Sequence, residues 1–236
     1  MKIPNNSPKK VEIFAGDRAQ NYDRNILQVI PGYDLIYTLI ACLLQQRLPN
    51  DASILVAGSG SGKELECLSQ TNLSWQFLAV DPSPDMMEIA KAKVEERGLK
   101  TRVKFLTGLV SDVPADFLYD AATLCLVLHF LPDDGTKLNL LENIAQRLKP
   151  NAPLILVDTY GELNSQSFKT ILDTLKCYFL HNGMSRQQVE DAIARLYSQL
   201  HVTSEPRLVQ LLENAGFATV NRFYSALLCG GWVAFR

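Results

Sequence analysis

The chain has 236 residues, a hydrophobic content of 47% and a formal net charge of −2. A chain of this length and composition can bury one good core, so we expect a single globular domain over residues 1–236. The nearly balanced charge excludes a broad basic field, which argues against nucleic acid as a partner.

Helix stops and apolar runs predict the elements up to residue 158. Residues 1–10 are polar with two prolines, and we expect them to be loosely attached. Helical spacing of apolar residues predicts a helix over 33–48, which Pro49 ends. Apolar strands and helices then alternate, as in a doubly wound sheet. The strands are expected at 53–57, 75–80, 104–107, 124–131 and 154–158, and the helices from Ser61 onward, at 84–97 and at 136–149.

The alternation stops after residue 158. Residues 160–203 predict two consecutive helices with no strand between them, and we expect this insertion to lie above the strand ends as a lid, a homodimer surface or simple core packing. A helix capped by Thr203 or Ser204 follows, and then strands at 219–227 and 230–235. The domain therefore divides into an entrance segment and helix (10–50), a core (51–159), a helical cap (160–203) and a final helix and strand pair (204–236).

The cysteines and histidines show no metal-ligand spacing. Five cysteines are scattered without a C-x-x-C pair, and the three histidines lie far from them in sequence. We therefore expect reduced thiols, a cytoplasmic location and no metal. No run of about eighteen uncharged apolar residues is present, and residues 1–10 lack the apolar core of a signal peptide, so we expect no membrane segment.

The run Gly58-Ser59-Gly60-Ser61-Gly62 directly follows the first apolar strand, and Asp81 closes the second. Glycines let the backbone turn sharply and approach a ligand, and the N–H groups of the following helix face it. The acid is placed to accept hydrogen bonds from a ribose diol. A Walker loop would need glycine where Ala57 stands, and a dinucleotide fingerprint would need it at Lys63. The layout therefore predicts a nucleotide-type ligand of another class.

The Gly-x-Gly-x-Gly pattern resembles motif I of the class I S-adenosylmethionine-dependent methyltransferases. Residues 81–90, 104–108, 148–158 and 211–217 resemble later segments of that family in the same order. The resemblance implies a Rossmann-like α/β fold with a seven-stranded sheet whose last strand is antiparallel, and S-adenosyl-L-methionine as cofactor. The residues that we expect to bind this cofactor are Tyr22, Tyr33, Gly58, Ser59, Gly60, Gly62, Asp81, Pro82, Met86, Gly108, Leu109, Val110 and Cys125.

A closer resemblance involves the segment before the glycine turn. Residues 14–24 and 29–33 resemble the entrance segment of the enzymes that make carboxy-S-adenosylmethionine for oxyacetylation of the tRNA wobble uridine. Three positions depart from that pattern. Its adenine-binding acid falls on Leu109, its fourth-strand asparagine on Cys125, and the arginine that pairs with the extra carboxylate on Ile193.

These departures favour ordinary S-adenosylmethionine. An unpaired carboxylate in an apolar pocket costs several kcal/mol. Arg195 follows Ile193 by two residues, which on a helix predicts a different face. Without the adenine-binding acid, we expect backbone groups of residues 108–110 or the side chain of Asp112 to bind the amino group of the ring.

Two side chains after strand ends are candidates for catalysis. His129 is expected at the end of the fourth strand, where it faces the crevice as a general base or is a hydrogen-bonded strand-end histidine. Tyr160 follows the fifth strand and faces the same crevice, as a catalytic or a wall residue. We therefore expect methyl transfer to a small-molecule acceptor by positioning and desolvation. The alternatives are a carboxy-S-adenosylmethionine synthase and a cofactor-binding protein without catalysis.

Overall fold

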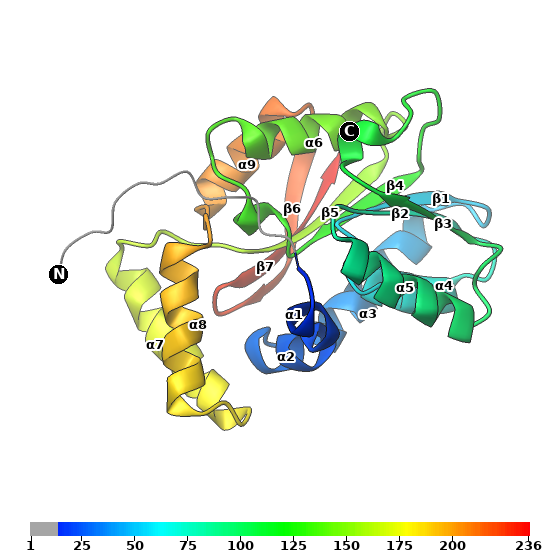
Figure 1. Cartoon of the computed structure of the whole chain (residues 1–236). Helices are drawn as coiled ribbons and strands as arrows, with labels where there is room; N and C mark the ends of the chain where they lie inside the picture. The colour runs from blue at the N-terminus through cyan, green and yellow to red at the C-terminus, as the bar shows by residue number, and fades with distance from the viewer. Residues whose placement is uncertain (1–13) are drawn as a thin grey trace.

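The computed structural model describes residues 14–236, so the prediction for residues 1–10 lies outside the described part of the chain. A sheet of seven strands is covered by helices on both faces (Figure 1). The strands are β1 (Ser53–Ala57), β2 (Gln76–Asp81), β3 (Val103–Thr107), β4 (Ala121–Cys125), β5 (Pro153–Thr159), β6 (Ala218–Ala226) and β7 (Cys229–Phe235). The α-helices are α1 (Asp17–Gln20), α2 (Tyr22–Val29), α3 (Tyr33–Arg47), α4 (Lys63–Thr71), α5 (Pro84–Glu96), α6 (Thr136–Gln146), α7 (Gln166–His181), α8 (Arg186–Ser198) and α9 (Glu205–Asn214).

The strand order is β3-β2-β1-β4-β5-β7-β6. Strands β1 to β5 pair in parallel, and β7 is antiparallel to both β5 and β6. The predicted doubly wound, seven-stranded sheet with an antiparallel last strand is confirmed. The order reverses between β1 and β4, and the carboxyl ends of parallel strands at such a reversal form the usual ligand crevice.

Strand β1 is apolar because both of its faces are covered. Ile54 and Val56 pack with residues of α3, α4 and α5, whereas Leu55 and Ala57 pack with residues of α6 and α9. All four side chains are buried. Figure 1 shows these two helix groups on opposite sides of the sheet. The hydrophobic effect of burying both faces fixes the position of β1, and with it the glycine turn that follows.

Local signals explain where several helices begin. Helix α5 begins after Ser83, whose hydroxyl accepts a hydrogen bond from the Met86 N–H at 3.2 Å. Helix α8 begins with a capping box in which Ser185 and Gln188 satisfy each other's backbone N–H groups. The residue before α9 is Ser204, one of the two predicted caps, although its side chain makes no capping hydrogen bond.

The predicted fourth strand over 124–131 is too long. Strand β4 ends at Cys125, because Leu126 has a φ of 58°, in the left-handed region, and its N–H donates to the carbonyl of Val157 at 2.7 Å. A 3-10 turn, η2 (Leu128–Phe130), follows. His129 therefore lies on this turn and not on the strand.

The two inserted helices are confirmed as α7 and α8, and they form a small apolar core of their own around Phe168, Leu172 and Leu196. They lie beside α1 and α2, away from the main body of the sheet (Figure 1). Gln28 of α2 donates to the carbonyl of Asn182 at 3.2 Å, and the Asn182 side chain donates to the carbonyl of Gln28 at 3.3 Å. The insertion and the entrance segment therefore contact each other directly.

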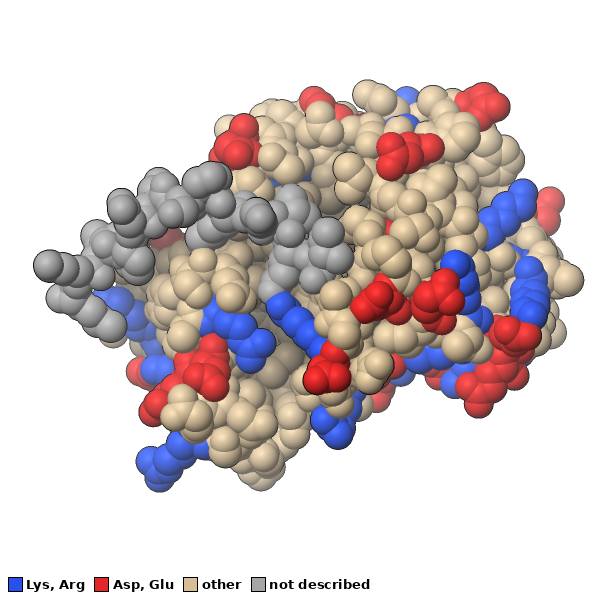
Figure 2. Space-filling view, viewed as in Figure 1, with Lys and Arg blue, Asp and Glu red and all other residues tan. Residues whose placement is uncertain are grey.

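Charged side chains of both signs are mixed on the face shown in Figure 2. Within residues 14–236 no single helix is long and apolar enough to cross a membrane. Only α2 and α3 taken together have the length and composition for this, and the chain bends by 93° between them.

Candidate functional site

A cavity of about 260 Å³ opens at the carboxyl ends of β1, β2, β3 and β4. We call it the strand-end cavity. Ten of the residues expected to bind the cofactor line it, namely Tyr22, Gly58, Gly60, Asp81, Pro82, Met86, Gly108, Leu109, Val110 and Cys125. Residues from separate parts of the sequence thus meet at the switch point of the sheet, as the motif predicts.

The glycine turn brings backbone close to the strand-end cavity. Gly58 has a φ of 69°, and a Cβ atom there would lie 2.3 Å from Cγ2 of Val127. Gly60 also has a positive φ, of 49°. Any side chain at residue 58 would meet Val127 and adopt an unfavourable backbone conformation, so glycine is required there.

Asp81 ends β2 at the edge of the strand-end cavity. Its Oδ2 atom accepts from the N–H of Gly60 at 2.9 Å, and its Oδ1 atom accepts from the N–H of Ser83 at 2.8 Å. Burial raises the pKa of this carboxyl group, and the two backbone hydrogen bonds oppose the rise. Each oxygen retains a lone pair for a hydroxyl group of a ligand.

The loop after β3 forms an apolar wall. Leu109 lines the strand-end cavity and is 57% exposed. Asp112 is not among the lining residues, because its Oδ2 atom accepts from the N–H of Leu109 at 2.7 Å and holds the loop in place. The Asp112 side chain therefore supports the backbone of this loop and does not reach into the cavity.

A second cavity, of about 330 Å³, lies beneath the inserted helices. We call it the insertion cavity. Residues of α2, α7 and α8 line it together with the ends of β4 and β5. Phe14, Tyr22, Leu126 and Phe130 line both cavities, so the two adjoin. The helical insertion thus encloses a space beside the strand-end cavity.

Ile193 and Arg195 of α8 both line the insertion cavity. Residues two apart on a helix point in different directions, and the cavity is wide enough for both side chains to border it. Arg18 of α1 lines the same cavity, and its guanidinium lies 4.2 Å from the centre of the Phe14 ring. The pKa of Arg18 is lowered by burial and, to a smaller extent, by the nearby positive charge of Arg195.

His129 lies on the wall of the insertion cavity and is buried. Its Nδ1 atom hydrogen-bonds to Oδ1 of Asp158, a buried residue of β5. The same oxygen accepts from the N–H of Thr159 at 2.9 Å. A carboxylate accepts hydrogen bonds, so Nδ1 carries the proton and Nε2 keeps its lone pair for a ligand. This is the arrangement of an oriented general base.

Buried Lys137 fixes the turn that carries His129. Its Nζ atom donates to the carbonyl of Leu128 at 2.7 Å and to that of His201 at 2.8 Å. The N–H of His201 in turn donates to the carbonyl of His129 at 2.7 Å. Desolvation lowers the pKa of Lys137, and the charge of Asp158 opposes that change. The turn is therefore anchored to α6 and to the segment after α8.

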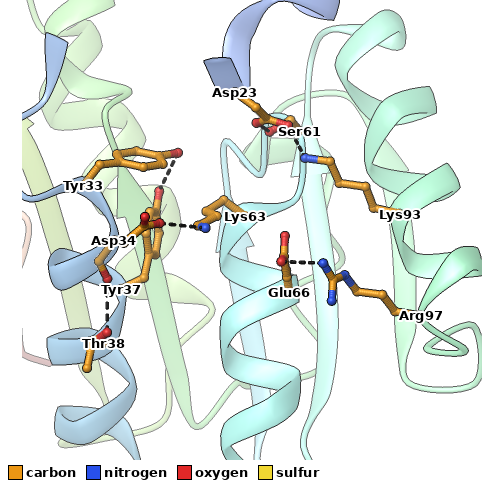
Figure 3. Close-up of polar contacts among 10 residues, drawn as sticks. All are labelled: Asp23, Tyr33, Asp34, Tyr37, Thr38, Ser61, Lys63, Glu66, Lys93 and Arg97. Carbon is orange, nitrogen blue, oxygen red and sulfur yellow. Dashed lines mark hydrogen bonds and ion pairs between the residues drawn. The ribbon is translucent and has the colours of Figure 1, made fainter. Parts of the chain in front are cut away.

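Tyr22 is held over both cavities through its neighbour Asp23. The Asp23 carboxylate accepts from the hydroxyl of Ser61 in the glycine turn and from Nζ of Lys93 on α5 (Figure 3). Further along, the Lys63 ammonium lies 2.9 Å from the carboxylate of Asp34 on α3. Ion pairs and hydrogen bonds thus tie the entrance helices to the glycine turn.

Four residues expected at the site lie outside the lining of both cavities. Gly62 precedes α4 with a φ of 87°, and Ser59 donates its hydroxyl to the Met87 sulfur at 3.6 Å. Tyr33 is buried and accepts a hydrogen bond from the Tyr37 hydroxyl at 3.3 Å (Figure 3).

Tyr160 is the fourth, and it does not face the crevice. Its ring packs edge-on against Trp232, with 5.1 Å between the ring centres. Its hydroxyl oxygen lies 3.1 Å from the hydroxyl oxygen of Ser225, with which it forms a hydrogen bond. The chain turns toward β6 and β7 after β5, so the side chain joins the C-terminal strands and contacts neither cavity.

Sequence reasoning missed several residues of the site. The position of Asp158 at the end of a predicted strand was the only sequence signal that it could belong to the site. Its pairing with His129 depends on β4 and β5 being neighbours in the sheet. Phe14, Leu126 and Phe130 had no sequence signal beyond being apolar. Glu64 had no such signal either, and within residues 14–236 one of its side-chain oxygens is buried without a hydrogen bond.

Comparison with known proteins identifies a methyltransferase domain in part of the chain. A family model described as a methyltransferase domain matches residues 55–154. A carboxy-S-adenosyl-L-methionine synthase of Campylobacter jejuni subsp. doylei is 24% identical over 230 residues, which are 98% of this chain and 96% of that protein. A protein of the same name from Actinobacillus succinogenes is 23% identical over 238 residues, covering 91% of this chain and 92% of that protein.

Solved structures share the fold. A putative O-methyltransferase from Nostoc punctiforme superposes with a TM-score of 0.68 at 18% identity, covering 92% of this chain. The pyocyanin biosynthetic protein PhzM superposes with a TM-score of 0.65 at 18% identity, covering 93% of this chain. The present chain spans 59% of the length of each of these two proteins.

The family match includes the glycine turn, Asp81 and the strands that form the strand-end cavity, and the sheet order is that of the solved relatives. Residues 55–154 therefore match a methyltransferase domain, and the chain has the fold of solved S-adenosylmethionine-dependent methyltransferases.

Proposed function

We propose that this enzyme transfers the methyl group of S-adenosylmethionine to an oxygen or nitrogen atom of a small-molecule acceptor, with His129 as the general base. The observation that carries this proposal is the buried His129–Asp158 pair on the wall of the insertion cavity. That cavity adjoins the strand-end cavity, which suits the cofactor. An acceptor bound beneath α7 and α8 would lie between the histidine and the cofactor.

The residues of the strand-end cavity fit S-adenosylmethionine. The adenosine needs an acceptor for the ribose hydroxyls and an apolar slot for the adenine, and Asp81 and Leu109 supply these. Glycine at residue 58 lets the backbone pass close to Val127, which also lines this cavity. The methyl group of the cofactor is already activated by the sulfonium, so the protein needs only to orient the acceptor and exclude water.

His129 would take the proton from the acceptor. Asp158 fixes the ring orientation and leaves Nε2 free to accept. Phe14, Leu126 and Phe130 line both cavities and make the boundary between them apolar. General base catalysis in such a setting contributes about 10²- to 10⁴-fold in rate.

The test has two steps. Hydroxylated and amine-bearing small molecules are first screened for binding in the presence of S-adenosylhomocysteine by thermal shift. Methyl transfer to each binder is then followed with His129→Gln and Asp158→Asn. We expect a loss of kcat of about 10²-fold or more with cofactor affinity unchanged. Methyl transfer by His129→Gln at the parental rate would refute the role of His129.

A second candidate function is synthesis of carboxy-S-adenosylmethionine. The relatives that bear this name align with nearly the whole chain, and Arg195 lines the insertion cavity within reach of a carboxylate-bearing ligand. Mass spectrometry of the cofactor retained by the purified protein separates the candidates, because a retained cofactor with an extra carboxylate favours the synthase. A purely cofactor-binding protein is disfavoured by the enclosed cavity beside His129.

A further inference from the structure

Lys137 is a lysine in the interior of the protein. It lies in the first turn of α6 and is fully buried. Its charge interacts with that of Asp158, but the Asp158 carboxylate bonds to His129 and not to the ammonium group. Burying an ammonium group costs free energy unless its donors find partners. The position of Lys137 therefore calls for an explanation.

The Lys137 ammonium group joins two segments that are far apart in sequence. Its Nζ atom lies 2.7 Å from the carbonyl oxygen of Leu128, which precedes His129 in η2. It lies 2.8 Å from the carbonyl oxygen of His201, in the exit segment (residues 199–204) that leads from α8 to α9. The N–H of His201 in turn donates to the carbonyl of His129 at 2.7 Å. Helix α6, the turn η2 and the exit segment are therefore each bonded to the other two.

The exit segment also contacts the acceptor side of the site. Gln199 and Leu200 line the insertion cavity. The N–H of Gly161, in the loop after β5, donates to the carbonyl of Thr203 at 3.0 Å. The segment thus bonds to the loops that follow β4 and β5, and these strands are neighbours in the sheet. Since the histidine comes from the first loop and its carboxylate partner from β5, the exit segment and the base are held in place together.

We propose that Lys137 is a positioning residue for the general base, because its ammonium group fixes η2 against the exit segment and thereby directs Nε2 of His129 toward an acceptor in the insertion cavity. This inference rests on the proposed role of His129. Lys137 itself lines neither cavity, so it acts on the reaction through the histidine. Misplacement of a reacting group by about 1 Å can cost about 10²-fold in rate, so such support matters for catalysis.

The chemistry of lysine suits this role. An ammonium group on a long unbranched stem carries three donors, so it can bind two carbonyl groups at once. Its charge makes these hydrogen bonds stronger than those of a neutral donor, which offsets part of the cost of burial. Methionine has a similar length and flexibility but no donor. Lys137→Met therefore removes both contacts while it keeps most of the side-chain volume.

The experiment compares the full-length parent with Lys137→Met and Leu141→Ala. Leu141 is buried on the same helix, so Leu141→Ala lowers stability but leaves the ammonium group in place. The first measurement is NMR of protein with isotope-labelled histidine, in which an Nδ1–H held by a buried carboxylate gives a proton resonance far downfield. His129→Gln assigns this resonance. The second is methyl transfer to the acceptors found in the thermal-shift screen, with affinity for S-adenosylhomocysteine measured by calorimetry.

In Lys137→Met we expect the His129 resonance to move or disappear and kcat to fall about 10- to 100-fold, with the affinity for S-adenosylhomocysteine unchanged. Leu141→Ala should keep the parental resonance and the parental kcat at a temperature where it is folded, although its melting temperature is lower. This contrast separates a positioning role from a general contribution of α6 to stability.

Three results would overturn the inference. They are a parental resonance in Lys137→Met, a parental kcat in that variant, and equal losses in Lys137→Met and Leu141→Ala. If Lys137→Met does not fold, Lys137→Gln replaces it, since the shorter amide cannot reach both carbonyl groups; parental values of both measurements would then contradict the proposal. A parent that transfers no methyl group would fail the proposed function, and the resonance would still decide whether Lys137 positions His129.

Discussion

The pH dependence of folding gives a sharp test of the burial of Glu64. Its pKa is raised from 4.5 to about 8 in the folded protein, mainly by desolvation. A raised carboxyl pKa means that stability from this group is fully present below the unfolded pKa and is lost as the pH rises through the folded pKa. The difference corresponds to about 5 kcal/mol between acid and alkaline pH, as an upper bound.

Replacing Glu64 by Gln removes this titration and keeps the shape of the side chain. The parent without cofactor should therefore lose stability relative to Glu64→Gln between pH 5 and pH 8, by up to about 5 kcal/mol. The assay is urea unfolding of both proteins and of Glu66→Gln at several pH values. Glu66 is the matched control, because it lies on the same helix and pairs with Arg97 at the surface (Figure 3). The expected result is that Glu66→Gln follows the parent. Parallel pH profiles for Glu64→Gln and the parent would refute the burial of an unpaired acid.

Three further predictions concern the cofactor and its cover. Asp81→Ala should weaken cofactor binding by about 1.5–3 kcal/mol through loss of a charge-assisted hydrogen bond, and equal affinity in calorimetry would contradict the ribose assignment. Gly58→Ala should abolish cofactor binding and lower the melting temperature, because its Cβ atom meets Val127 at 2.3 Å; a variant with parental binding would show that the turn relaxes freely. Asp23→Asn weakens the contacts to Ser61 and Lys93, so cofactor dissociation measured by stopped flow should accelerate, and an unchanged rate would mean that the entrance helices do not limit release.

The sequence was most informative where a residue pattern depends on local physics. Apolar strands buried on both faces, helix stops and the glycine turn predicted the parallel core and the place of Asp81. The fourth strand was predicted too long because the left-handed conformation of Leu126 is set by its contact with Val157, far along the chain.

The acceptor side of the site could not be derived in the same way. The pairing of His129 with Asp158 requires knowing that β4 and β5 are neighbours and where β4 ends. Tyr160 was placed at the crevice from its position after a strand, yet Trp232 and Ser225 determine where its side chain lies. The insertion cavity is built from residues 14–31 and 175–200 together, and no pattern within either segment specifies their contact.

The most direct test of methyl transfer uses S-adenosylmethionine labelled with deuterium in its methyl group. The labelled cofactor is incubated with the parent protein, with His129→Gln and with the acceptors that bind in the thermal-shift screen, and the products are analysed by mass spectrometry. Our account predicts that the parent moves the intact labelled methyl group to an oxygen or nitrogen of a small molecule and that His129→Gln does so at least about 10²-fold more slowly. Conversion of the cofactor into a carboxylated form, with no labelled methyl group on any acceptor, would contradict it.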